Sequence, residues 1–207
     1  MLVAVITASA CGGDDSPESS TPEISISGDD GFVDLLLTSD DFDDISSLAG
    51  LAREVGTTAG IYEDPDPRAP CGAPVLFPAT DAIATFSGTD ITVLNLVGSD
   101  GGAEYIEAMR DDARPGCPDH TRETNIPGQN QTVTFLGEVR LPAVGDNRIA
   151  LRSRIRTTAD LEAVEVMISD GELHTAFLAL GNPDSLALSD AEIVAIADRM
   201  AERIAKD

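Results

Sequence analysis

Two β-rich runs near the end of the chain, residues 161–169 and 172–180, constrain the fold more than any other feature. They flank Asp170-Gly171, a dipeptide that favours the positive φ angles of a two-residue β-turn. Apolar runs joined by so short a turn pair with each other in antiparallel fashion. The sequence therefore predicts a β-hairpin, and with it an antiparallel sheet that buries the apolar side chains.

Other segments predict further strands and helices. Strands are expected where residues alternate or form apolar runs, at 32–37, 82–87, 91–97, 131–139 and 148–157. Helices are expected where apolar residues recur at helical spacing, at 40–48, at 103–114, and after the capping box Ser189-x-x-Glu192. The order is not an alternating βαβ pattern, so a parallel sheet is not expected.

These elements indicate one domain over residues 31–207. We expect an α+β fold, in which an antiparallel β-sheet has its helices packed on one face. Hydrophobic residues make up 42% of the chain, which is enough for a core, and aromatic residues only 4%. The core should therefore be mainly aliphatic.

An apolar leader ends at Cys11. Residues 2–10 read LVAVITASA, which is shorter than the ~20 apolar residues that span a bilayer but typical of a signal peptide. The small residues before Cys11 resemble the bacterial lipobox, whose cysteine receives a diacylglyceryl thioether. We expect residues 1–10 to be a lipoprotein signal peptide and Cys11 to be the lipidation site. The alternative is an ordinary cleaved signal peptide or a buried strand.

The segment after Cys11 differs from the rest of the chain. Residues 11–30 are rich in Gly, Ser, Pro and acidic residues and cannot pack a core. We expect this segment to be a disordered acidic tether between the lipidated cysteine and the domain. The cell membrane would then be the first partner, and the domain would lie on its extracytoplasmic face.

Two cysteines remain once Cys11 carries lipid. Cys71 and Cys117 form an even pair, and such pairs are oxidised outside the cytoplasm. The enclosed loop of about 47 residues would give roughly 4 kcal/mol in the chain-entropy model. The spacing matches no zinc pattern, so we expect a structural disulfide that staples the domain. A redox-active pair is the alternative, although no C-x-x-C arrangement is present.

The formal charge of −24, from 37 acidic and 13 basic residues, excludes some partners. A surface this acidic repels nucleic acid at long range, and a chain without Trp offers few rings for base or sugar stacking. Nucleic acid is therefore not an expected partner.

Several short motifs resemble a known family. In chain order they are the lipobox, the tether, LLLTSDDF at 35–42, Ala69-Pro70-Cys71-Gly72, Arg114-Pro115-Gly116-Cys117, residues 144–152 and residues 201–205. The same order is similar to that of actinobacterial lipoproteins with the extracellular sensor domain of PknH-type serine/threonine kinases. The resemblance implies one α+β domain with a cleft between sheet and helices for a small ligand. It brings no catalytic residues.

Four arginines occupy even-numbered positions of the strand predicted at 148–157. Arg148, Arg152, Arg154 and Arg156 would lie on one face of the sheet. Such a positive stripe could bind a carboxylate, a phosphate or an acidic lipid headgroup through bidentate forks. Alternatively, the arginines lie on a solvated face and pair with acidic residues of the neighbouring strand.

Patterns for catalysis or metal binding are weak. His120 and His174 are the two histidines, and no Gly-x-Ser-x-Gly motif accompanies them. The acidic runs 40–44 and 63–66 lack the spacing and the glycine of an EF-hand loop. We therefore expect no catalytic residue, no metal and no cofactor.

These expectations combine into one functional hypothesis with two alternatives. We expect a cell-envelope lipoprotein whose domain binds a small or lipidic ligand, or acts as a sensor accessory, without catalysis. The apolar faces of the strands within 82–97 and 161–180 would line its cleft. The first alternative is an envelope scaffold with a protein partner and no pocket. The second is a hydrolase, which would need His120 or His174 in a buried cluster with a serine and a carboxylate.

Overall fold

The computed structural model describes residues 30–56, 80–113, 120–123, 130–156 and 159–205. The predicted signal peptide, the tether, the lipidation site Cys11 and the Cys71–Cys117 pair lie outside the described residues. They remain predictions.

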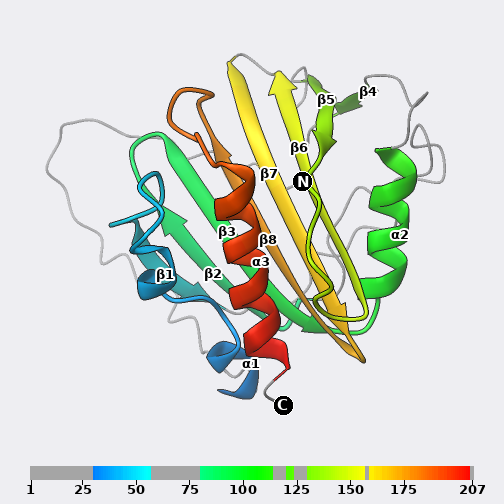
Figure 1. Cartoon of the computed structure of the whole chain (residues 1–207). Helices are drawn as coiled ribbons and strands as arrows, with labels where there is room; N and C mark the ends of the chain where they lie inside the picture. The colour runs from blue at the N-terminus through cyan, green and yellow to red at the C-terminus, as the bar shows by residue number, and fades with distance from the viewer. Residues whose placement is uncertain (1–29, 57–79, 114–119, 124–129, 157–158, 206–207) are drawn as a thin grey trace, which may run out of the picture.

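The described strands form one antiparallel sheet in the order β1-β2-β3-β8-β7-β6-β5-β4 (Figure 1). Their bounds are β1 Ala52–Gly56, β2 Ala82–Ser87, β3 Ile91–Ser99, β4 His120–Glu123, β5 Asn130–Glu138, β6 Asn147–Arg156, β7 Asp160–Asp170 and β8 Leu173–Gly181. Every pair of neighbours runs antiparallel. The predicted α+β class with an antiparallel sheet is therefore confirmed.

The hairpin predicted near the end of the chain is formed by β7 and β8. Asp170 pairs with Leu173, so the two turn residues are Gly171 and Glu172, one position later than predicted. Gly171 has a φ of 58°, which a glycine adopts without steric cost. The shift extends the hairpin end of β7 by one residue, to Asp170, and β7 still pairs with β8 as predicted.

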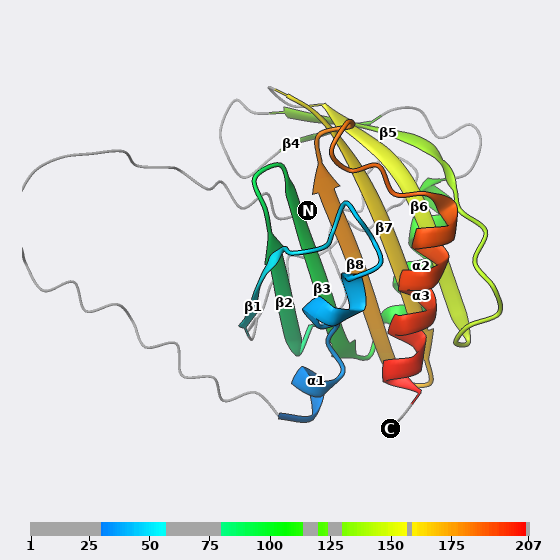
Figure 2. The same cartoon turned by 60° about the vertical axis from the view of Figure 1, so that its left-hand side comes forward.

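Helices pack on both faces of the sheet. Their bounds are α1 Asp30–Asp34, the 3₁₀ helix η1 Ser39–Phe42, α2 Gly102–Asp112 and α3 Asp190–Ile204. Figure 2 shows α3 in front of the sheet and α2 behind it. The prediction that all helices share one face is therefore wrong for α2. Its apolar stripe required burial, but a stripe does not specify which face buries it.

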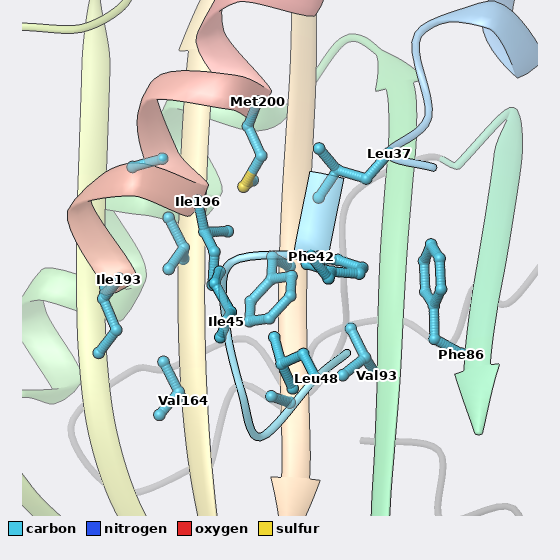
Figure 3. Close-up of a cluster of buried hydrophobic side chains, with 14 of the residues drawn as sticks. Leu37, Phe42, Ile45, Leu48, Phe86, Val93, Val164, Ile193, Ile196 and Met200 are labelled. Atoms are coloured by element: carbon cyan, nitrogen blue, oxygen red, sulfur yellow. The ribbon is translucent and has the colours of Figure 1, made fainter. Parts of the chain in front are cut away.

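The core of the first face forms around Phe42 of η1. Its ring lies 4.9 Å from that of Phe86 on β2, edge to face, and 6.1 Å from that of Phe177 on β8, measured between centroids. Ile196 and Met200 of α3 join this cluster (Figure 3), and both are at most 1% exposed. The core thus ties η1 and α3 to the centre of the sheet.

The core of the second face forms beneath α2. Ile106 and Met109 of this helix pack against Ile149 and Leu151 of β6 and against Met167 of β7. The predicted apolar stripe of the helix is confirmed, and β6 has one row of residues on each face. The odd-numbered residues of β6 face α2, and the even-numbered ones face the side of α3.

The segment at 32–37 is not the predicted strand. Residues 30–34 form α1, and the chain then runs without regular structure into η1. The backbone N–H of Leu37 donates to Oδ1 of Asn95 on β3 at 2.7 Å. The amide of Asn95 donates in turn to Thr175 Oγ1 and to the carbonyl of Ala176. This buried side chain thus satisfies the last backbone N–H of an apolar run that has no strand partner.

The helix predicted at 40–48 is shorter than expected. It ends as η1 at Phe42, and Thr38 is its N-cap. The backbone N–H and the hydroxyl of Thr38 both donate to Oδ2 of Asp41, at 2.6 and 2.9 Å. Turns follow, and they bury Ile45 and Leu48 in the first core.

α3 begins at the predicted capping box. The side chain of Ser189 accepts from the backbone N–H of Glu192, whose carboxylate accepts from the N–H of Ser189. Further along, Arg203 pairs with Asp41 at 2.6 Å and Arg199 with Asp44 at 2.7 Å. These two ion pairs join the last turns of α3 to η1 and to the turn that follows it.

The hydrogen bond between Arg199 and Asp44 shifts the pKa of each partner. It lowers the pKa of Asp44 below its usual value and raises the pKa of Arg199. Both side chains are thereby held in their charged forms.

The two edge strands were not predicted. β1 and β4 are short, and neither segment has the apolar alternation on which a strand prediction depends. Among the described helices, none is long and apolar enough to cross a membrane.

Candidate functional site

The site forms where β5 ends before its partner β6 does. The last residue of β5 is Glu138, which pairs with Leu151, and the N–H of Val139 still donates to the carbonyl of Ala150. Residues 147–149, the first of β6, are not paired with β5. This leaves an open stretch of strand edge next to α2.

The connection between β5 and β6 is held in place by its own sequence. Pro142 has no N–H to continue a ladder, and Gly145 turns the chain with a φ of 60°. Asp146 then returns to the sheet, where its N–H donates to the carbonyl of Ser169 at 2.8 Å and its Oδ2 accepts from Gly171 at 3.2 Å. The connection is thus anchored to the β7–β8 turn.

A pocket of about 520 Å³ lies between this connection, the open edge of β6 and α2. Its volume is within the range of small-molecule sites, about 300–1,000 Å³. The lining residues are Arg110, Glu138, Val139, Arg140, Leu141, Asp146, Asn147, Arg148 and Ile149.

Three of the lining residues are arginines. Arg110, near the end of α2, pairs with Glu107 and donates from Nη2 to the carbonyl of Arg148 at 3.0 Å. The guanidinium groups of Arg140 and Arg148 make no hydrogen bond or ion pair within the part of the chain that the structure describes. Two cationic groups at the pocket are therefore available to a ligand.

Two acidic residues also line the pocket. Glu138 and Asp146 are exposed, and Asp146 already accepts the Gly171 N–H. Three arginines and two acids give the lining a formal charge of +1, in a chain whose net charge is −24. The lining of the pocket therefore carries a positive charge, although the protein as a whole is acidic.

The structure separates the four arginines of the predicted stripe. Arg148 lines the pocket. Arg152 donates from Nη2 to the carbonyl of Leu188, at 2.6 Å, and to Asp190, at 2.8 Å, at the start of α3. This arginine therefore helps to position the helix.

The other two arginines pair across the strands. Arg154 contacts Glu162 at 3.3 Å and Arg156 contacts Asp160 at 2.9 Å, and each acid is the register partner of its arginine on β7. This is the arrangement that the alternative interpretation of the stripe expected. Of the four predicted arginines, only Arg148 therefore lines the pocket.

Arg110 and Arg140 were not among the predicted site residues. They come from α2 and from the β5–β6 connection, 38 and 8 residues before Arg148. The available signal was weak: Arg140 is a cation among apolar residues just past a predicted strand end. Only the packing of α2 on β6 brings the three arginines together.

The predicted lining of a cleft is wrong. The apolar faces of β2, β3, β7 and β8 are filled by packed side chains. Phe86, Val93, Val164 and Phe177 are at most 2% exposed and belong to the first core. On this face, η1 and α3 cover the strands, and the apolar side chains form core.

The residues weighed for a hydrolase meet only in part. His174 and Ser169 are register partners at the end of the β7–β8 hairpin, and they are 1% and 3% exposed. Gly102 of α2 closes over them, since a Cβ there would lie 2.6 Å from Cβ of His174. No Asp or Glu is buried among the described residues. His120 lies on β4, and the structure does not describe its side chain.

The acidic runs weighed for calcium have other roles or lie elsewhere. Asp41 and Asp44 pair with arginines of α3, and residues 63–66 lie outside the described part. Among the described residues, no group of three or more His, Cys, Asp or Glu side chains could hold a metal ion.

Comparison with known proteins places the fold. No protein-family model matches the chain, and no curated protein matches it in sequence. A crystal structure of the extracellular domain of PknH from Mycobacterium tuberculosis superposes with a TM-score of 0.58. The match covers 86% of this chain and 96% of the other.

The two chains share a fold. Their sequence identity of 12% is too low to transfer more than architecture. The fold implied by the sequence motifs is thereby confirmed, and a ligand or a signalling role is not part of that result.

Proposed function

We propose that this protein is a lipid-anchored, non-enzymatic binding domain on the extracytoplasmic face of the cell membrane. The pocket beside Arg148 is its ligand site. The observation that carries the proposal is this preformed pocket of about 520 Å³, anchored by hydrogen bonds on both sides, in a fold shared with an extracellular domain. The ligand is a small molecule or the headgroup of a lipid.

The lipid anchor is the first part to test. Cys11 follows a signal-like leader, and a tether-like segment follows Cys11. Mass spectrometry of the protein extracted from membranes of its host should find the chain starting at Cys11 with a diacylglyceryl group. Cys11→Ser should release the protein from the membrane fraction. An unmodified Cys11 in membrane-extracted protein would contradict the anchor.

The disulfide is tested separately. If Cys71 and Cys117 are joined, peptide mapping under non-reducing conditions should recover the two cysteines in one linked fragment. A free thiol at both positions in protein secreted by the host would overturn the pairing.

Ligand binding is tested by native mass spectrometry. The full chain carrying Cys11→Ser is incubated with a small-molecule and lipid extract of the host envelope, then desalted and weighed. We expect a bound mass in the parent protein. Asn147→Trp, which places a large ring in the pocket lining, should abolish it.

A matched variant controls for the added ring. Thr134→Trp changes a half-buried residue of β5 that is not part of the lining, and it should retain the bound mass. No bound mass in any variant, together with recovery of a stoichiometric protein partner, would favour the scaffold alternative.

A further inference from the structure

We infer that the ligand group held in this pocket is a single oxyanion, a phosphate or a carboxylate, bound by Arg140 and Arg148. The inference rests on the proposed function, because it names the chemistry of the ligand at that same site. The observation that supports it is the unused hydrogen-bonding capacity of these two guanidinium groups.

The other arginines whose side chains the structure describes are engaged. The described arginine side chains that make hydrogen bonds are Arg53, Arg110, Arg152, Arg154, Arg156, Arg199 and Arg203. Among the arginine side chains that the structure describes, Arg140 and Arg148 make none, and both residues line the same pocket. In a chain with 37 acidic residues, two arginines that line one pocket and form no ion pair with a described residue suit an anion from outside.

Arg110 anchors the backbone of the pocket and does not pair with the Arg140 or Arg148 side chains. Its guanidinium is held by Glu107 and by the carbonyl of Arg148. It therefore fixes the backbone from which the Arg148 side chain extends. A guanidinium presents its N–H donors in a planar fork that matches two oxygens of a phosphate or carboxylate. An anchored backbone lowers the ordering cost of forming that contact.

The other lining residues limit which kinds of anion can bind. Glu138 and Asp146 would repel a ligand that carries several charged groups, such as a polyphosphate chain. Leu141, which is half-buried, adds apolar surface to the lining, whereas Val139 and Ile149 are at most 5% exposed and belong to the two cores. The pocket thus fits one anionic group on a partly apolar body, either a small organic acid or phosphate ester or the headgroup of an anionic lipid.

The test uses the full chain carrying Cys11→Ser and inorganic phosphate, acetate and glucose as probes in calorimetric titrations. Phosphate or acetate should bind and glucose should not. Arg140→Gln and Arg148→Gln should each weaken anion binding, and the double variant should weaken it at least about tenfold, since each lost charge-assisted contact is large. Raising the NaCl concentration should weaken binding as well.

Arg154→Gln is the matched control. It removes the same charge from the same strand, but at a side chain paired with Glu162, so anion binding should stay within about twofold of the parent, as expected for a distant charge. Circular dichroism of each variant checks that it is folded. If Arg154→Gln and the double variant lose the same anion affinity, the effect comes from net charge alone and the proposed site is wrong.

Vesicles distinguish the two sources of the anion. Binding of the lipid-free chain to phosphatidylglycerol vesicles but not to phosphatidylcholine vesicles, lost in the double variant, identifies a headgroup. Binding of free phosphate or acetate alone identifies a soluble ligand. Failure of all anionic probes overturns the inference.

Failure of the inference can be told from failure of the proposed function. Suppose that a neutral molecule from the envelope extract binds the parent and the double arginine variant, but not Asn147→Trp. The pocket is then a ligand site, but its ligand is not an anion. Absence of any bound mass rejects both.

Discussion

The guanidinium of Arg110 donates a hydrogen bond of 3.0 Å to the carbonyl oxygen of Arg148. This contact joins the end of α2 to the open edge of β6, and both arginines line the pocket. A strand edge without a partner is usually capped or covered. Here Arg110 caps the edge through the carbonyl of Arg148, and the side chain of Arg148 stays available to a ligand.

Gly145→Ala should destabilise the domain and disturb the pocket. A Cβ at this position would lie 2.7 Å from the carbonyl oxygen of Ser169 and from a methyl group of Ile168. Gly50→Ala is the matched control, because Gly50 also has a positive φ, of 77°, but open space around it. Urea unfolding should show Gly145→Ala to be about 1–3 kcal/mol less stable than Gly50→Ala. Equal effects would mean that only backbone strain matters at Gly145.

Local patterns predicted the elements that lie near one another in sequence. The capping box at Ser189 fixed the start of α3, and the Asp170-Gly171 signal located the β7–β8 hairpin to within one residue. Both signals arise from hydrogen bonds or backbone angles within a few residues, which a single sequence contains.

Contacts between distant segments were not predictable in this way. The run at 32–37 has the composition of a strand, but the backbone N–H of Leu37 is satisfied by Asn95, which lies 58 residues away. The stripe of α2 does not show which face of the sheet it covers. The candidate site depends on that placement and on the end of β5 at Glu138, so only Arg148 of the predicted stripe lines the pocket.

Asn95→Ala should be among the most destabilising polar substitutions. It would leave the buried N–H of Leu37 without its 2.7 Å acceptor, and an unsatisfied buried donor costs about 1–3 kcal/mol. Asn182→Ala removes an exposed contact to Asp90, of 3.3 Å, and should change the free energy of unfolding by less than about 0.5 kcal/mol. Urea unfolding of both variants measures the difference. A loss at Asn95 no larger than at Asn182 would refute the role of this amide.

The ion pair between Arg203 and Asp41 should contribute more than the pair between Arg156 and Asp160. The side chains of the first pair are 22% and 17% exposed, whereas those of the second are 65% and 56% exposed. Double-mutant cycles with alanine should give a coupling above about 1 kcal/mol for the first pair, and below about 0.5 kcal/mol for the exposed pair. Similar couplings would contradict a fastening role for the contact between η1 and α3.

The contact between Arg199 and Asp44 should make stability depend on pH in the acid range. Its hydrogen bond lowers the pKa of Asp44 in the folded state below the reference value of 3.8. The stabilisation is therefore fully present above the unfolded-state pKa and is lost as the pH falls through the folded-state pKa. The stability difference between the parent and Asp44→Asn should be constant from pH 5 to 7, and it should shrink below about pH 4.

Salt provides the control for this pH effect. The carboxylate of Asp44 is exposed, so 1 M NaCl should reduce the difference between the parent and Asp44→Asn. Urea unfolding at pH 3 and pH 6, at low and high salt, measures it. A difference that grows toward low pH would have the opposite sign from this prediction.

The central claim is that an anionic ligand binds beside Arg148, and nuclear magnetic resonance tests it most directly. Amide spectra of the full chain carrying Cys11→Ser are recorded while phosphate is added, with NaCl of equal ionic strength as the reference. We expect the shifts to concentrate at residues 138–141 and 146–149. Shifts concentrated around Arg154 and Arg156, or none beyond those caused by NaCl, would contradict the claim.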